Sequence, residues 1–200
     1  MSNLVAFGCS HTAGHALPDH HLMCNVPSKF AWPQILANIL EKDCVNKGIC
    51  GASSTEILLE ILNYPFLKDD EVVVMWTFVG REVIISENQQ HIQLMPNAPA
   101  CSEPYEHYLK LHPAYDLNYR TWLTMHHAFM HLLNLRIKFH FCTVVPMPPL
   151  LEVRPAWAQC IKLLDFNGNI YHTYPRALDN MHPGVECHER YAYNLFHSMY

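Results

Sequence analysis

Strand-like runs alternate along this chain with segments of helical periodicity, and this alternation limits the possible folds more than any other feature. The strand-like runs are residues 4–7, 44–46, 71–77 and 138–145, of which 71–77 is the clearest. Buried strands of a parallel sheet read as continuous apolar runs. Strands that alternate with helices predict a parallel sheet covered by helices on both faces. The expected fold class is therefore α/β.

The segments between these runs predict helices at 32–40, from Ser53 or Ser54 onward, at 119–133 and at 185–199. Glu56 stands where a capping-box partner of Ser53 belongs. From about 84 to 118 the pattern gives way to polar, proline-containing sequence. We expect an insertion there, with a small hairpin formed by 83–85 and 91–94. No linker or repeat is visible, so residues 1–200 are predicted to form one domain.

Charge and hydropathy exclude several classes of partner. The chain has 13 basic and 18 acidic residues, a net charge of −5, and no basic block, so no nucleic-acid partner is expected. No apolar run reaches the roughly 18 residues that cross a bilayer, so no membrane partner is expected either. The N-terminus lacks a secretory pattern, and we expect a cytoplasmic protein. Its oligomeric state does not follow from the sequence.

The metal-ligating residue types are numerous, with 15 histidines and eight cysteines. No Cys-x-x-Cys pair occurs, and reduced thiols are expected. His11, His15, His20 and His21 cluster near Ser10, and His127 and His131 have the spacing of two ligands on one helix face. A metal site needs a third ligand, and none is visible. Structural or surface histidines, with no metal and no cofactor, are therefore the favoured interpretation, and a metal site is the alternative.

A serine and an Asp-x-x-His motif stand at opposite ends of the chain. Ser10 follows the first strand in Gly8-Cys9-Ser10, and the carboxyl ends of parallel strands border the active crevice of open α/β sheets. A capping serine is the alternative interpretation. Asp179 and His182 lie just before the last predicted helix. A serine nucleophile needs a histidine base, and an acid orients that base, so the predicted catalytic residues are Ser10, His182 and Asp179.

A reaction at such a serine also needs hydrogen-bond donors that stabilise the negatively charged oxygen of the intermediate, the oxyanion. The backbone N–H groups of Ser10 and Gly51 are candidates, since glycine lets the backbone approach a substrate closely. We take His11 and Arg81 as candidate substrate-binding residues. Arg81 could instead pair with Glu82 or another carboxylate.

In these motifs the chain resembles the SGNH hydrolases, the GDSL-type esterases. Gly8-Cys9-Ser10 resembles their nucleophile block, 46–53 the block whose oxyanion glycine corresponds to Gly51, and 179–183 their acid–base block. The opening Gly-Cys-Ser-x-Thr-x-Gly more narrowly resembles a subgroup often found in bacteriophages and marine bacteria. The resemblance implies a flavodoxin-like three-layer α/β/α sandwich with strand order 2-1-3-4-5, and metal-free hydrolysis of acyl or acetyl esters through an acyl-enzyme.

The segment after the third strand departs from the family. Most members have an asparagine there that donates to the oxyanion, whereas this chain has Trp76-Thr77-Phe78-Val79-Gly80-Arg81. Thr77 or Arg81 is a candidate substitute, and the alternative is an oxyanion hole with only two donors. Cys9 replaces the usual aspartate, and a Cys9 nucleophile is a minor alternative.

Three functions follow as hypotheses. The first is a serine ester hydrolase that cleaves a small acyl or acetyl ester, with a carbohydrate as one candidate alcohol. The second is a non-catalytic or weakly catalytic ligand-binding protein that retains the pocket, and the third is an acyltransferase that uses the same triad.

Overall fold

The strand that is buried at every residue, β3 (Glu71–Trp76), lies inside a parallel sheet. The computed structural model describes residues 2–20, 26–88, 91–94, 102–145, 156–164 and 174–200. Its other elements are β1 (Asn3–Gly8), α1 (Ser10–Ala13), α2 (Trp32–Ile39), β2 (Asp43–Gly48), α3 (Ser54–Asn63), β4 (Glu82–Ile85), β5 (His91–Leu94), α4 (Ser102–Leu111), α5 (Ala114–Asn134), β6 (Lys138–Thr143), α6 (Ala156–Gln159) and α7 (Val185–Met199).

The parallel sheet has the order β2-β1-β3-β6, which corresponds to the first four strands of the predicted order 2-1-3-4-5. The α/β class is confirmed, but the strand order needs a correction. Among the described residues, the fifth position holds only an isolated parallel bridge between Phe141 and Leu163. Residues 165–173, which follow this bridge in the sequence, lie outside the described residues.

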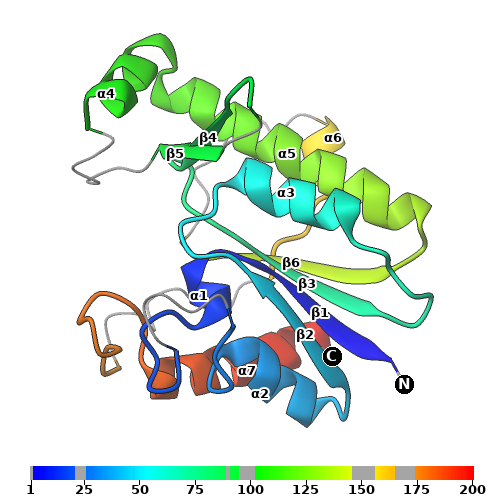
Figure 1. Ribbon diagram of the computed structural model, residues 1–200. Helices are drawn as coiled ribbons and strands as arrows, with labels where there is room; N and C mark the ends of the chain where they lie inside the picture. The colour runs from blue at the N-terminus through cyan, green and yellow to red at the C-terminus, as the bar shows by residue number, and fades with distance from the viewer. Residues whose placement is uncertain (1, 21–25, 89–90, 95–101, 146–155, 165–173) are drawn as a thin grey trace.

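Two layers of helices enclose the sheet, as Figure 1 shows: α2 and α7 cover one face, and α3 and α5 cover the other. The capping box predicted at α3 is present, with Ser53 and Glu56 each bonded to the other's backbone N–H. Helix α2 has no side-chain cap of its own. Instead, the buried His188 of α7 accepts a hydrogen bond from the Trp32 N–H at 3.1 Å, which joins the two helices.

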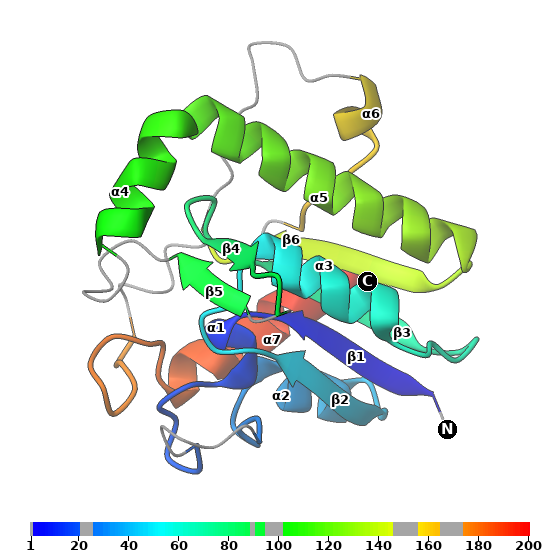
Figure 2. The same ribbon diagram turned by 45° about the horizontal axis from the view of Figure 1, so that its top comes forward.

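The predicted insertion contains regular structure (Figure 2). Strands β4 and β5 form the expected antiparallel hairpin. The polar stretch beyond it is nevertheless not all loop: it includes α4, and α5 begins at Ala114 rather than at residue 119. Pro113 stands at the N-cap of α5 and Asp116 lies in its first turn, two features that favour a helix start there.

A buried carboxylate joins elements at the amino ends of the strands. Glu71 of β3 contacts Lys42 at 2.5 Å, Lys138 at 2.7 Å and His140 at 3.2 Å, and accepts hydrogen bonds from the Tyr200 hydroxyl. Burial alone raises the pKa of Glu71, but these partners together lower it well below its ordinary value. The candidate site lies at the opposite, carboxyl ends of the strands.

The described cysteines, which are Cys9, Cys44, Cys50, Cys142, Cys160 and Cys187, are all free. None of the helices in the described part of the chain is long and apolar enough to cross a membrane.

Candidate active site

Ser10 is placed by the sharp turn from β1 into α1. Strand β1 ends at Gly8, Cys9 is the N-cap of the helix, and Ser10 is the first helical residue. The helix ends after one turn at Gly14, whose φ of 75° lies in the left-handed region that glycine adopts readily. The Asn46 side chain of β2 donates to the carbonyl of Thr12 at 2.7 Å and so fastens α1 to the sheet. Ser10 is consequently held at the carboxyl edge of the sheet.

A short loop before α7 carries Asp179 and His182. One carboxylate oxygen of Asp179 accepts the backbone N–H groups of Met181 at 2.9 Å and His182 at 3.0 Å. The loop is fastened to the turn after α1, because the Leu178 N–H donates to the Ala16 carbonyl at 3.1 Å. This contact brings residues from the two ends of the chain to the same place (Figure 1).

The three side chains that the sequence singled out form a continuous line of contacts. His182 Nδ1 lies 2.6 Å from the second oxygen of Asp179, and His182 Nε2 lies 3.1 Å from Ser10 Oγ. A carboxylate only accepts hydrogen bonds, so the proton of a neutral His182 belongs on Nδ1. Nε2 is then an acceptor aimed at the Ser10 hydroxyl. This is the geometry that general-base activation of a serine requires.

Asp179 is well suited to remain charged. Burial alone raises the pKa of its carboxyl, but the hydrogen bonds from the backbone and ring of His182 and from the Met181 backbone lower that pKa to about 2. The carboxylate is therefore ionised at neutral pH.

More histidines surround His182. The His15 ring packs edge-on against it with centroids 4.7 Å apart, and His11 does so at 5.8 Å. Burial, followed by the nearby His182, lowers the pKa of both His11 and His15. Both rings are accordingly neutral at pH 7.

Gly51 lies in the loop between β2 and α3, at the same edge of the sheet. Its φ of 81° is left-handed, and a Cβ at this position would lie 2.5 Å from Oε1 of Gln93. Gln93 belongs to the β4–β5 hairpin and donates to Glu56 at 3.3 Å. A Cβ here would meet the end of the Gln93 side chain, and the left-handed backbone favours glycine. The neighbouring Cys50 contacts His15, which connects the Gly51 loop to the surroundings of His182.

The segment that follows β3 lies beside His11. Thr77 is fully buried, and its hydroxyl accepts a hydrogen bond from Arg81 at 3.3 Å. The Arg81 guanidinium also lies 4.8 Å from the Phe78 ring centroid, and Phe78 packs against His11 at 6.1 Å. The ion pairs found among the described residues do not include Arg81, so the alternative pairing of Arg81 with Glu82 is not seen there.

The structure thus brings Ser10, Asp179 and His182 into direct contact and places His11 next to them. Cys9, the alternative nucleophile, is fully buried in the hydrophobic core. His127 and His131 belong to no group of three ligands among the described residues, and His21 lies outside these residues. The sequence did not predict that Gln93 lies against Gly51, because no motif marks this position. It also did not predict the hydrogen bond from the Asn46 side chain to the Thr12 carbonyl of α1.

Comparisons with known proteins bear on the fold. No family model and no curated protein matches the sequence. Solved structures do match, although their sequence identity is low. A protein described as lipolytic and of the G-D-S-L family, from Desulfitobacterium hafniense DCB-2, is 15% identical with a TM-score of 0.56, and the match covers 98% of each chain. The chain has the fold of this protein.

Two more solved structures agree. TesA is 14% identical with a TM-score of 0.58, and the match covers 99% of this chain and 97% of that one. Axe2, an acetylxylan esterase from Geobacillus stearothermophilus, is represented by a catalytic mutant that is 14% identical with a TM-score of 0.56, covering 98% of this chain and 93% of that one. The matches extend over nearly the whole of each chain.

Proposed function

We propose that the protein is a serine ester hydrolase of the GDSL type that cleaves a small acyl or acetyl ester, with acetylated carbohydrates as the first substrates to try. The observation that carries the proposal is the line of contacts from Asp179 through His182 to Ser10. The fold shared with a lipolytic protein and with an acetylxylan esterase supports it. The narrower kinship with the phage and marine subgroup rests on sequence motifs: the opening motif, Trp32-Pro33, and the segment from Trp76 to Glu82.

The reaction uses these three residues in turn. Ser10 Oγ attacks the ester carbonyl carbon while its proton passes to His182 Nε2. Asp179 stabilises the imidazolium that forms. When the tetrahedral intermediate collapses, the C–O bond to the alcohol breaks and His182 gives its proton to the departing oxygen. Water then attacks the acyl-Ser10, His182 takes its proton and returns one to Ser10, and the free acid leaves.

The negative oxygen of the intermediate needs hydrogen-bond donors. We assign the role of these donors to the backbone N–H groups of Ser10 and Gly51. Ser10 supports the assignment because it opens α1, where backbone N–H groups have no partner within the helix. Thr77 is a weaker candidate, because its hydroxyl already accepts from Arg81 and would have to turn its proton toward the substrate. Arg81 and His11 are proposed to contact the substrate.

Hydrolysis of p-nitrophenyl esters from acetate to octanoate, together with acetate release from acetylated xylo-oligosaccharides, tests this function. We expect Ser10→Ala and His182→Ala to lower kcat/KM by about a thousandfold or more. Ser198→Ala and His197→Ala change exposed residues at the end of α7 and serve as controls. A correctly folded protein that binds these esters without turnover would instead support the binding-protein hypothesis.

A further inference from the structure

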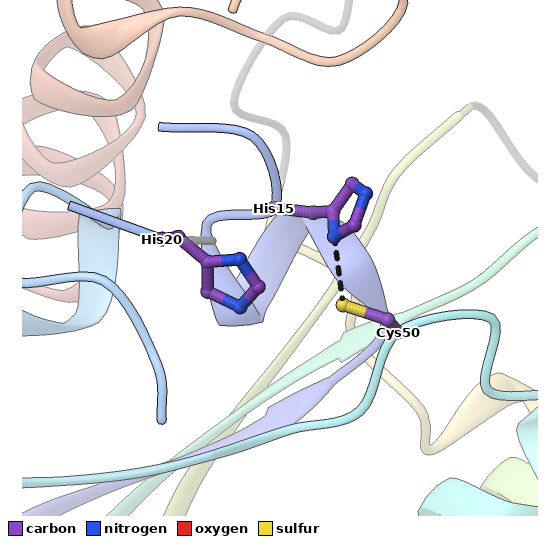
Figure 3. Close-up of side chains that lie close together, drawn as sticks. All are labelled: His15, His20 and Cys50. Atoms are coloured by element: carbon purple, nitrogen blue, oxygen red, sulfur yellow. Dashed lines mark hydrogen bonds between the residues drawn. The ribbon is translucent and has the colours of Figure 1, made fainter. Parts of the chain in front are cut away.

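A cluster of soft and borderline ligands lies beside the proposed active site. It consists of His15 and His20, both in the segment that follows α1, and Cys50, in the loop between β2 and α3 (Figure 3). His15 Nδ1 and Cys50 Sγ are 3.3 Å apart, and one ligand atom from each of the three residues lies within 4.8 Å of the others. Two separate segments of chain therefore place three ligand atoms around one point.

The chemistry and the spacing suit a zinc ion. Zn²⁺ binds imidazole nitrogen at about 2.0–2.1 Å and thiolate sulfur at about 2.3 Å, so two ligands of a tetrahedral ion lie about 3.3–3.6 Å apart. The 3.3 Å between His15 Nδ1 and Cys50 Sγ lies at the short end of this range. The ligand atom of His20 lies within 4.8 Å of the other two, so at most a small movement of this side chain would complete the site.

The burial of the three side chains also fits a site that an ion enters from solvent. His20 is 5% exposed, and its Nδ1 is buried without a hydrogen-bond partner among the described residues. A buried polar atom of this kind costs free energy unless something binds it. His15 is partly buried and Cys50 is exposed, so one side of the cluster is open.

We propose that His15, His20 and Cys50 form a binding site for a divalent cation of the borderline-soft class, with Zn²⁺ as the expected ion. The Cys50 thiol loses its proton to solvent as the Zn–S bond forms. With three protein ligands, the fourth position is left to water, as in zinc sites that keep an open position. Cys50 is the third ligand that the spacing of the histidines alone does not reveal.

A second group of potential ligands overlaps this one. His15, Asp179 and His182 also hold ligand atoms within 4.8 Å of one another, so His15 belongs to both groups. We favour the site with Cys50 for two reasons. Thiolate binds Zn²⁺ strongly, and both Asp179 and His182 already have hydrogen-bond partners within the proposed triad.

The test is a titration of chelator-treated full-length protein with Co²⁺, whose spectrum reports the ligands directly. The proposal predicts one equivalent bound, a thiolate-to-cobalt charge-transfer band, and displacement of Co²⁺ by Zn²⁺. Cys50→Ser and His15→Gln should each weaken binding about tenfold or more, since even the loss of an outer partner of a ligand has an effect of that size. Cys160→Ser changes another exposed cysteine and should leave binding unchanged.

His182→Ala separates the two overlapping groups, because it removes a ligand from the second group only. Retained binding in His182→Ala together with loss in Cys50→Ser supports the proposed site. Loss in His182→Ala with full binding in Cys50→Ser would overturn it and place the ion on the triad. Absence of the charge-transfer band in a folded wild-type protein would also overturn it. Circular dichroism checks the fold of each variant.

Discussion

His182 Nδ1 lies 2.6 Å from Oδ2 of Asp179, and both residues belong to one short loop whose backbone Asp179 also holds. A single side chain thus sets the shape of the loop and the tautomer of the imidazole. Asp179→Asn keeps the size of the side chain but presents either an amide N–H or a weaker acceptor to the ring. We expect kcat to fall by about a thousandfold or more, as follows from the wrong tautomer.

The measurement for Asp179→Asn is kcat on the best p-nitrophenyl ester, with Asp69→Asn as a matched change at an exposed aspartate. An Asp179→Asn enzyme within threefold of the wild type would show that Asp179 only shapes the loop.

Gly51→Ala tests the proposed oxyanion loop. An alanine there would strain a backbone with φ of 81° by about 1–3 kcal/mol and would bring its Cβ against Gln93. We expect the loop to shift and kcat to fall about tenfold or more, with a smaller change in KM. The double variant Gly51→Ala, Gln93→Ala removes the clash but not the strain, so it should recover only part of the activity. Full activity in Gly51→Ala would remove Gly51 from the mechanism.

The Glu71 cluster makes stability depend on pH. The pKa of Glu71 is lower in the folded than in the unfolded protein, in which it is about 4.3. Its contribution to the free energy of unfolding is therefore fully present above that pH and is lost as the pH falls further. Glu71→Gln should lower the free energy of unfolding by about 2 kcal/mol at pH 7.

Urea unfolding at pH 7 and at several values below pH 4.3 measures this effect. The difference between wild type and Glu71→Gln should shrink as the pH falls, whereas Glu189→Gln, at an exposed position of α7, should give no difference at any pH. A Glu71→Gln difference that does not change with pH would contradict the assignment.

The hydrogen bond between the Trp32 N–H and His188 predicts a second effect on stability. Burial, with a contribution from His182, lowers the pKa of His188 to about 3, so the ring is a neutral acceptor at pH 7. His188→Leu leaves the N–H of Trp32 unpaired and should destabilise the fold by about 1–3 kcal/mol. His188→Gln retains an acceptor and should cost less. Equal thermal stability of the two variants would show that the bond contributes little.

The comparison with the sequence shows which features are local. The helix cap at Ser53, the turn at Gly8-Cys9-Ser10 and the spacing of Asp179 and His182 depend on residues close in the chain, and the structure has all three. That Ser10 would meet His182 was expected because the two residues stand in the first and last connections of an α/β chain, in motifs that resemble those of the GDSL-type esterases.

Features that depend on distant packing were not predictable in the same way. Gln93 lies against Gly51 because of the way the hairpin folds back, and nothing in its own neighbourhood indicates this position. Cys50 joins His15 and His20 only after β2 has paired with β1. Among the described residues, the fifth strand of the expected order is likewise represented only by the bridge between Phe141 and Leu163.

Labelling with a fluorophosphonate tests the central claim most directly, because the reagent reacts with a serine only where a base activates it. The structure predicts one adduct per chain, located on Ser10 by peptide mapping, formed in wild type and in Cys9→Ser and lost in Ser10→Ala. His182→Ala should fold and react far more slowly. An adduct that persists in Ser10→Ala, or a wild type that forms none while remaining folded, would contradict the claim that Ser10 is the nucleophile of an ester hydrolase.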